Sequence, residues 1–296
     1  MVDQELLKES LKPVISLLDQ CPTGIRIPSN WEAPEGYRLE TLDVAGVPVE
    51  HLVPNNDNGK VILQFHGGGF LYSYLDNYRD VACMYSKVAN GAAVYSVDYR
   101  VAPQYRYPCA HEDCLSVYKW LLNKGIKNED IIIVGDSAGG NLALSIPLQI
   151  RDQGMPLPKA VLALSPWANL KGGYKARTEN YEKDIILGKY GIKMGEGVWD
   201  PTYYTEEENF CNPYVSPVYG DYTDFPDVLI QAGSFEMLLD DAKTVVEKAV
   251  AKGVNATLTV YEEMPHDFQL FLPSLEETNR AWYEIHNFLC KEFELL

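Results

Sequence analysis

Short runs of apolar and β-branched residues alternate along most of the chain with longer segments in which apolar residues recur three and four positions apart. The short runs have the length of buried strands, and the longer segments have the period of helices. This order predicts right-handed crossovers and an α/β fold, with a mostly parallel sheet that carries helices on both faces. The predicted strands are Val61–Phe65, Ala92–Val97, Ile131–Val134, Ala160–Leu164, Val228–Gln231 and Thr257–Tyr261, and the predicted helices are Asn77–Ala89, His111–Leu122, Leu238–Ala251 and Leu275–Phe293.

The N-terminal part of the chain has a different pattern. Apolar residues at near-helical spacing predict an amphipathic helix over the first twenty residues, which we expect to cover the core rather than to anchor a membrane. Residues 37–53 then alternate apolar and polar positions on both sides of Ala45 and Gly46, as the strands of a β-hairpin do. With this hairpin, the expected sheet has about eight strands.

One stretch interrupts the alternation of strands and helices. Residues 167–217 contain no clear strand and are rich in tyrosine, lysine and glutamate. A structureless loop of this length is rare inside a compact domain. We therefore predict that this stretch forms an inserted helical subdomain.

Composition and charge narrow the class of function. The formal net charge of −17 repels nucleic acid and anionic membrane surfaces, so it favours a neutral small-molecule substrate. Six scattered cysteines without a CxxC pair, together with only five histidines, argue against a zinc site and a disulfide framework. The sequence shows no apolar run typical of a signal peptide or a membrane span, and we expect a soluble cytoplasmic protein.

The sequence GDSAGG at 135–140 carries the strongest chemical signal. It contains G-x-S-x-G and stands between a buried strand and a helix-compatible sequence, which is the context of a sharp strand-to-helix turn. Such a turn projects the serine hydroxyl from the edge of the sheet, near the N-terminal amides of the helix that follows. We therefore predict that Ser137 is a catalytic nucleophile.

A second glycine cluster, FHGGGF at 65–70, directly follows a predicted strand. Consecutive glycines let backbone amides approach a substrate closely, and acyl transfer needs such amides to stabilise an oxyanion. We expect the amides of Gly68 and Gly69, together with that of Ala138, to form the oxyanion hole. A phosphate-binding turn is the alternative, but the cluster lacks both the Lys-Ser/Thr of a P-loop and GxGxxG spacing.

The serine also needs a base and an acid that orients the base. His266 lies just beyond the last predicted strand, where the chain order serine, acid, histidine places the base. The acid should come from the loop after the preceding strand, which contains Glu236 and, at the start of the next helix, Asp240. We favour Glu236, because a carboxylate in the first turn of a helix commonly complements the helix dipole. Asp240 remains the alternative.

With these residues identified, the chain resembles the hormone-sensitive lipase family of α/β-hydrolase esterases, which includes bacterial acetyl esterases and short-chain carboxylesterases. The resemblance runs from about residue 60 to the C-terminus and rests on HGGGF, DYRVAP, GDSAGG, SPW, NPYVSP and the segments around Glu236 and His266. It implies an eight-stranded α/β-hydrolase core at 36–296, with a cap built from residues 1–35 and about 168–212. Many relatives have an aspartate in place of Glu236.

These observations predict a serine esterase that cleaves short-chain carboxylic esters, acetyl to about hexanoyl, through an acyl-enzyme. No metal or organic cofactor is implied. An amidase or peptidase would use the same triad, and a non-catalytic small-molecule-binding module could use the same fold. A homodimer is an open alternative for which the sequence carries no signal.

Overall fold

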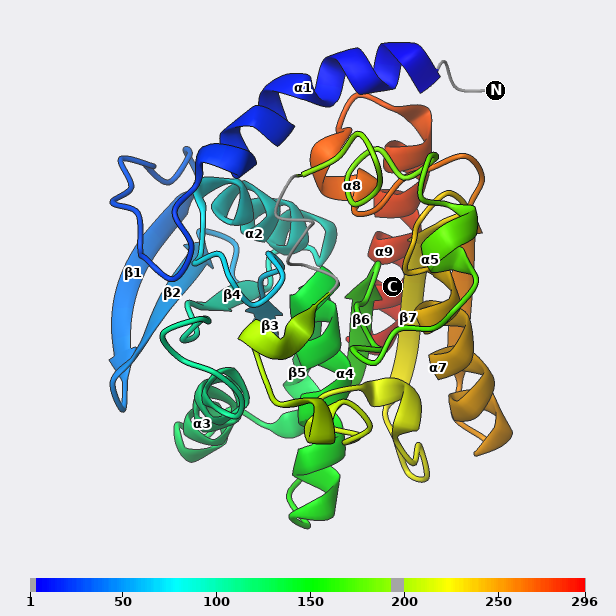
Figure 1. The fold of residues 1–296 in the computed structure, drawn as a ribbon. Helices are drawn as coiled ribbons and strands as arrows, with labels where there is room; N and C mark the ends of the chain where they lie inside the picture. The colour runs from blue at the N-terminus through cyan, green and yellow to red at the C-terminus, as the bar shows by residue number, and fades with distance from the viewer. Residues whose placement is uncertain (1–3, 193–199, 296) are drawn as a thin grey trace.

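The computed structural model describes residues 4–192 and 200–295 of the chain. Eight strands form one sheet in the order β1-β2-β4-β3-β5-β6-β7-β8 (Figure 1). The pairs β1/β2 and β2/β4 are antiparallel, and all the other pairs are parallel. The strands are β1 (Tyr37–Val44), β2 (Val47–Pro54), β3 (Val61–Phe65), β4 (Ala93–Val97), β5 (Ile131–Asp136), β6 (Ala160–Leu164), β7 (Asp227–Gly233) and β8 (Ala256–Tyr261). The predicted mostly parallel sheet of about eight strands is confirmed.

Helices cover both faces of the sheet. The side chains of its central strands are therefore buried on both sides. On β5, Ile131 and Ile133 pack with residues of α3 (Cys109–Asn123), α4 (Ser137–Asp152) and α7 (Leu239–Ala251). Ile132 and Val134 point the other way and pack with residues of α2 (Asp76–Val88) and α9 (Glu276–Glu292). The continuous apolar runs in the sequence are therefore typical of parallel strands that are buried on both faces.

The parallel strands place their carboxyl ends at one edge of the sheet. The register pairs Phe65 of β3 with Gly135 of β5, and Gly233 of β7 with Tyr261 of β8. The loops that follow these strands carry the glycine cluster, the candidate nucleophile, the candidate acid and the candidate base. Ligands of open α/β sheets bind beyond the carboxyl ends of the strands, so this edge is the expected place for a site.

The predicted N-terminal helix is α1 (Gln4–Gln20), which lies across one end of the molecule near α8 (Phe268–Phe271) in Figure 1. Its buried side chains, Leu7 and Leu11, pack in a cluster with Ile185, Met264 and Phe268. The helix thus covers the core, as we expected from its amphipathic pattern. Among the helices that the structure describes, none has the length and apolar character needed to cross a bilayer.

The long segment between β6 and β7 joins two neighbouring parallel strands of the sheet. Its described residues form the short helix α5 (Ala176–Glu179) and the 3-10 turns η2 (Pro201–Tyr203), η3 (Glu207–Asn209) and η4 (Pro217–Tyr219). A further 3-10 turn, η1 (Asn128–Asp130), lies outside this segment and precedes β5. The sequence led us to expect a helical insertion, whereas the described part consists mostly of turns and irregular backbone. Residues 193–199 of the expected insertion lie outside the described part of the chain.

Candidate active site

The strand-to-helix turn at Ser137 has the backbone that G-x-S-x-G predicts. Strand β5 ends at Asp136, helix α4 begins at Ser137, and Ser137 has a φ of 50°. This left-handed conformation is costly for a residue with a side chain, and such strain is concentrated at functional sites. A Cβ atom on Gly135 would lie 2.2 Å from the carbonyl oxygen of Gly139, and one on Gly139 would lie 2.1 Å from that of Phe65. The two flanking glycines are therefore required by space.

The HGGGF loop lies against the same cavity as Ser137. Gly68 and Gly69 have φ values of 101° and 64°, and both residues line the cavity together with Ser137. The carbonyl oxygen of Gly68 accepts hydrogen bonds from the N–H groups of Leu71 and Tyr72. Within the described part of the chain, the N–H groups of Gly68 and Gly69 donate no hydrogen bond, so they are available to a ligand. Ala138, whose amide we expected to help, is the second residue of α4 and is buried.

His66 anchors this loop and is absent from the lining of the cavity in front of Ser137. Its ring is buried, and Nδ1 lies 2.8 Å from the carbonyl oxygen of Gly67. The ring stacks on Tyr99 at 4.1 Å between centroids, and the Tyr99 hydroxyl donates to the His66 carbonyl oxygen. Burial lowers the pKa of His66 to about 4, against the smaller opposing effect of the Gly67 carbonyl, so the ring is neutral at pH 7.

Glu236 lies in the turn after β7, and its carboxylate faces the ring of His266. The side chain is 0% exposed; Oε2 is 3.5 Å from His266 Nδ1, and Oε1 accepts a hydrogen bond from the hydroxyl of Ser165 at 2.6 Å. Burial raises the pKa of Glu236 to about 7, although the contacts with His266 and Ser165 act in the opposite direction. Asp240, the alternative acid, instead accepts a hydrogen bond from the N–H of Ala176 at 3.0 Å.

His266 follows β8 and is 2% exposed, between two carboxylates. Its Nδ1 faces Glu236, and its Nε2 lies 3.0 Å from Oδ2 of Asp267. Among the described residues, no hydrogen bond joins the ring to Ser137, although both residues line one cavity. Burial lowers the pKa of His266, but Asp267 and Glu236 outweigh this effect, and the pKa lies well above its usual value.

Sequence reasoning missed two residues of this cluster, Ser165 and Asp267. The Ser165 hydroxyl donates to Glu236 and accepts from the N–H of Asp267, so one side chain ties the candidate acid to the segment that carries the candidate base. Asp267 also raises the pKa of the buried Asp136, for which burial is the larger cause. Ser165 could have been found as the first residue of the SPW motif after β6, but Asp267 had no signal beyond its position next to His266.

A second buried serine and histidine pair, Ser145 and His111, does not form a comparable site. His111 Nε2 lies 2.7 Å from the carbonyl oxygen of Tyr214, as well as 3.0 Å from the Ser145 hydroxyl. Its Nδ1 lies 3.1 Å from the hydroxyl of Tyr204. Both ring nitrogens thus have fixed partners, and burial lowers the pKa of His111 to about 4.

The cavity in front of Ser137 is mostly apolar. Its polar side chains include Ser137, His266 and Asp267. Among the residues that the structure describes, no group of three or more histidine, cysteine or acidic side chains could hold a metal ion. The apolar side chains that line the cavity are Leu18, Leu75, Trp167, Ile186, Leu187, Ile192, Leu238 and Phe271.

A mostly parallel sheet with a serine on a left-handed strand-to-helix turn, a glycine loop beside it and a histidine after the last strand defines an α/β hydrolase. A protein-family model described as "alpha/beta hydrolase fold" matches residues 62–270. The chain belongs to this family and, within it, to the hormone-sensitive lipase family, which confirms the resemblance seen in its motifs.

Individual relatives agree with this assignment. The chain is 32% identical to an acetyl-hydrolase of Streptomyces hygroscopicus over 82% of its own length and 79% of the relative. It is 32% identical to an esterase of Acinetobacter venetianus over 85% of its own length and 81% of the relative. Among solved structures, an esterase from the bacterial hormone-sensitive lipase family has a TM-score of 0.84 at 31% identity, covering 96% of this chain and 98% of its own.

Proposed function

We propose that this protein is a serine esterase that cleaves short-chain carboxylic esters. The observation that carries the proposal is that the strained Ser137 lines one cavity together with Gly68 and Gly69, whose N–H groups donate to no other described residue. A hydroxyl and two free amides at one place are what acyl transfer requires, namely a nucleophile and donors for the developing oxyanion. The relatives named as an acetyl-hydrolase and an esterase support the same reaction class.

The proposed reaction has two steps. His266 takes the proton of Ser137 while the Ser137 oxygen attacks the ester carbonyl carbon, and the amides of Gly68, Gly69 and Ala138 stabilise the oxyanion. The tetrahedral intermediate then expels the alcohol, which receives the proton from His266, and an acyl-Ser137 remains. Water, activated by the same histidine, releases the acid and restores the serine. Glu236 orients the ring of His266 and stabilises its protonated form.

The first proton transfer requires the base to change partner. Nε2 of His266 lies 3.0 Å from Asp267 and must face the Ser137 hydroxyl when the ester is bound. Catalytic hydrogen bonds often form fully only in the complex with substrate. The Nδ1 contact with Glu236 can be kept during this change, because it is made by the other ring nitrogen.

The lining of the cavity supports small neutral esters. Leu18, Tyr72 and Phe271 stand in the same cavity as Ser137, which leaves a confined apolar space for the acyl group. The described parts of residues 1–35 and about 168–212, which leave out 1–3 and 193–199, make up the proposed cap over this space. Among structural relatives, EstE5, solved after soaking with p-nitrophenyl butyrate, has a TM-score of 0.83 at 29% identity over 96% of this chain and 99% of its own.

The test is hydrolysis of p-nitrophenyl esters from acetyl to dodecanoyl by the wild type and by Ser137→Ala. We expect activity on the short esters and a loss of at least about 10³-fold in Ser137→Ala, with unchanged thermal unfolding. Equal inertness of both proteins on every ester would contradict the proposal. Turnover of p-nitroanilides without turnover of esters would indicate an amidase, and ester binding without turnover would indicate a binding module.

A further inference from the structure

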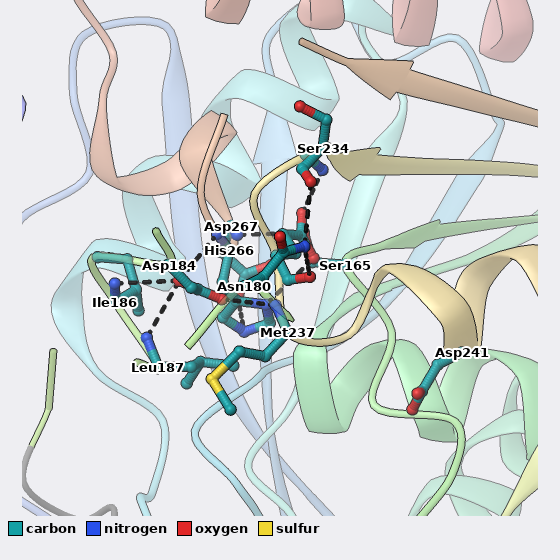
Figure 2. Close-up of polar contacts among 12 residues, drawn as sticks. Ser165, Asn180, Asp184, Ile186, Leu187, Ser234, Met237, Asp241, His266 and Asp267 are labelled. Carbon is teal, nitrogen blue, oxygen red and sulfur yellow. Dashed lines mark hydrogen bonds and ion pairs between the residues drawn. The ribbon is translucent and has the colours of Figure 1, made fainter. Parts of the chain in front are cut away.

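A buried carboxylate from the segment between β6 and β7 lies where the acid-bearing and base-bearing loops meet. Asp184 is 0% exposed, and its Oδ2 accepts a hydrogen bond from the N–H of Met237 at 2.9 Å. Its Oδ1 accepts a longer hydrogen bond from the N–H of His266 at 3.4 Å. Since Met237 directly follows Glu236, one side chain contacts the main chain of both loops (Figure 2).

The same carboxylate also shapes the wall of the cavity. Its Oδ1 accepts hydrogen bonds from the N–H groups of Ile186 at 3.1 Å and Leu187 at 3.2 Å, and both residues line the cavity in front of Ser137. The four donors come from three segments that are far apart in the sequence. Buried carboxylates need such partners, so the position of Asp184 is tied to the positions of all three segments.

Asn180, which lies just after α5, holds the acid-bearing loop from a second direction. Its Nδ2 donates hydrogen bonds to the carbonyl oxygens of Ser234 at 3.1 Å and Glu236 at 2.8 Å. The N–H of Met237 donates to Asp184, so two side chains from one segment hold the main chain of the acid-bearing loop at Ser234, Glu236 and Met237. Neither Asn180 nor Asp184 belongs to the nucleophile, the base, the acid or the oxyanion hole.

We propose that Asn180 and Asp184 are positioning residues that set the separation between Glu236 and His266. The inference rests on the proposed esterase function, because it assigns a purpose to the acid and base of that reaction. It gives the segment between β6 and β7 a role in building the catalytic machinery as well as in bounding the cavity. The relevant distance is that from Oε2 of Glu236 to Nδ1 of His266, which is 3.5 Å.

The contact between Glu236 and His266 is sensitive to small movements of either loop. At 3.5 Å, Oε2 of Glu236 and Nδ1 of His266 form an ion-pair contact, and neither atom has a hydrogen-bond partner among the described residues, so a small displacement of either loop would weaken their only link. Misplacement by about 1 Å can cost on the order of 100-fold in rate, even when it originates away from the reacting atoms. The loops themselves follow different strands, β7 and β8, and the side chain of Asp184 bridges them directly.

The first variant to measure is Asp184→Asn. The substitution keeps the shape of the side chain but replaces one acceptor oxygen with an NH₂ group, which cannot accept from a backbone N–H. We expect kcat on p-nitrophenyl butyrate to fall on the order of 10- to 100-fold, with KM changed by less than about threefold. The acid limb of kcat/KM should also move to lower pH, because a more distant Glu236 raises the pKa of His266 less.

A matched control is Asp221→Asn. Asp221 also accepts a hydrogen bond from the backbone N–H two residues further on, that of Thr223 at 3.1 Å, but its side chain is exposed and is not part of the cavity. This variant should keep the kcat and the pH profile of the wild type. The comparison of the two variants shows whether a loss of kcat comes from the position of Asp184 between the two loops or from replacing any aspartate in a turn.

A double-variant cycle distinguishes positioning from a loss of stability. If Asp184 acts through Glu236, its substitution should matter much less once the Glu236 carboxylate is absent. We expect Asp184→Asn to lower kcat by less than about threefold in a Glu236→Gln background. An equal loss in both backgrounds, with an unmoved pH profile, would show a merely structural role and would overturn the inference. So would a folded Asp184→Asn enzyme with the kcat of the wild type.

A second variant keeps the inference testable if Asp184→Asn does not fold. Asn180→Ala removes the donors to Ser234 and Glu236 and should give the same loss of kcat, pH shift and non-additivity with Glu236→Gln. Failure of the proposed function has a different signature, because wild type and Ser137→Ala would then be equally inert. Full activity in Glu236→Gln would reject the acid and the route through which Asp184 acts.

Discussion

The side chain of Asp267 lies against Nε2 of His266, the ring nitrogen that would accept the proton of Ser137 in the proposed reaction. Oδ2 of Asp267 is 3.0 Å from Nε2 of His266, and Asp267 has a left-handed φ of 49°, which is uncommon for a residue with a side chain. The N–H of Asp267 donates to Ser165, which holds this backbone in place. The ring of His266 is thereby placed between two carboxylates, Asp267 on one side and Glu236 on the other.

This arrangement predicts the effect of Asp267→Asn on the pH profile. Only the neutral form of His266 can accept the proton of Ser137, so a raised pKa places the acid limb of kcat/KM at a higher pH than an ordinary histidine would. Removing the Asp267 charge should lower the pKa of His266 and move that limb to lower pH. The measurement is kcat/KM for p-nitrophenyl acetate from about pH 5 to 9. An acid limb at the same pH in both enzymes would contradict this account.

The choice of the acid can be tested with two isosteric substitutions. Glu236→Gln should lower kcat by about 10³- to 10⁴-fold, because the carboxylate that orients the ring of His266 is lost. Asp240→Asn should leave kcat within about threefold, since Asp240 accepts from the N–H of Ala176 and an amide oxygen can do the same. The reverse ranking of the two variants, measured on p-nitrophenyl butyrate, would reassign the acid to Asp240.

Asp136 should make stability depend on pH. Its side chain is buried, it directly precedes Ser137 in the chain, and its Oδ2 accepts a hydrogen bond from the hydroxyl of Tyr78 at 3.2 Å. Burial, followed by the charge of Asp267, raises the pKa of Asp136 well above the value of about 3.9 that aspartate has in an unfolded chain. The folded state therefore binds this proton more tightly, so the contribution to stability is complete below about pH 3.9 and is lost as pH rises through the folded pKa.

Asp136→Asn removes this dependence, because an amide does not ionise in this range. The free energy of unfolding of the variant, relative to wild type, should therefore increase between pH 5 and pH 8 in urea denaturation. The difference between the two proteins isolates Asp136 from the other titrating groups. A difference that stays constant or decreases over this range would show that Asp136 is not held with a raised pKa.

Gly139 should be far less tolerant of a side chain than a glycine in an open turn. A Cβ atom on Gly139 would lie 2.1 Å from the carbonyl oxygen of Phe65 and 2.5 Å from that of His66, and both are backbone atoms. Gly154→Ala is the control, because Gly154 has a φ of 67° but nothing within 4 Å of its Cβ position. We expect a loss of about 1–2 kcal/mol for Gly154→Ala and about 3 kcal/mol or more for Gly139→Ala. Equal losses in chemical denaturation would contradict the backbone clash.

The sequence by itself determined most of the strands and helices and the strand-to-helix turn that carries Ser137. Predicted strands 61–65 and 160–164 coincide with β3 and β6, because a strand buried on both faces is a local run of apolar residues. The turn at Ser137 is equally local, since the glycines that permit it stand within two residues on either side. These features depend only on residues that are close together in the chain, so the sequence alone is enough to predict them.

Only the tertiary structure decided which side chains meet around His266. Glu236 and Asp240 are four residues apart, yet one faces the ring and the other faces the N–H of Ala176. Asp184 reaches the loops of both Glu236 and His266 across 53 and 82 residues of chain. Contacts over such separations depend on how β7, β8 and the segment before them pack. No periodicity or local motif records that packing, so Asp184 and Asp267 could not be recognised before the fold was known, whereas chain order alone points to Glu236 and His266 as candidates.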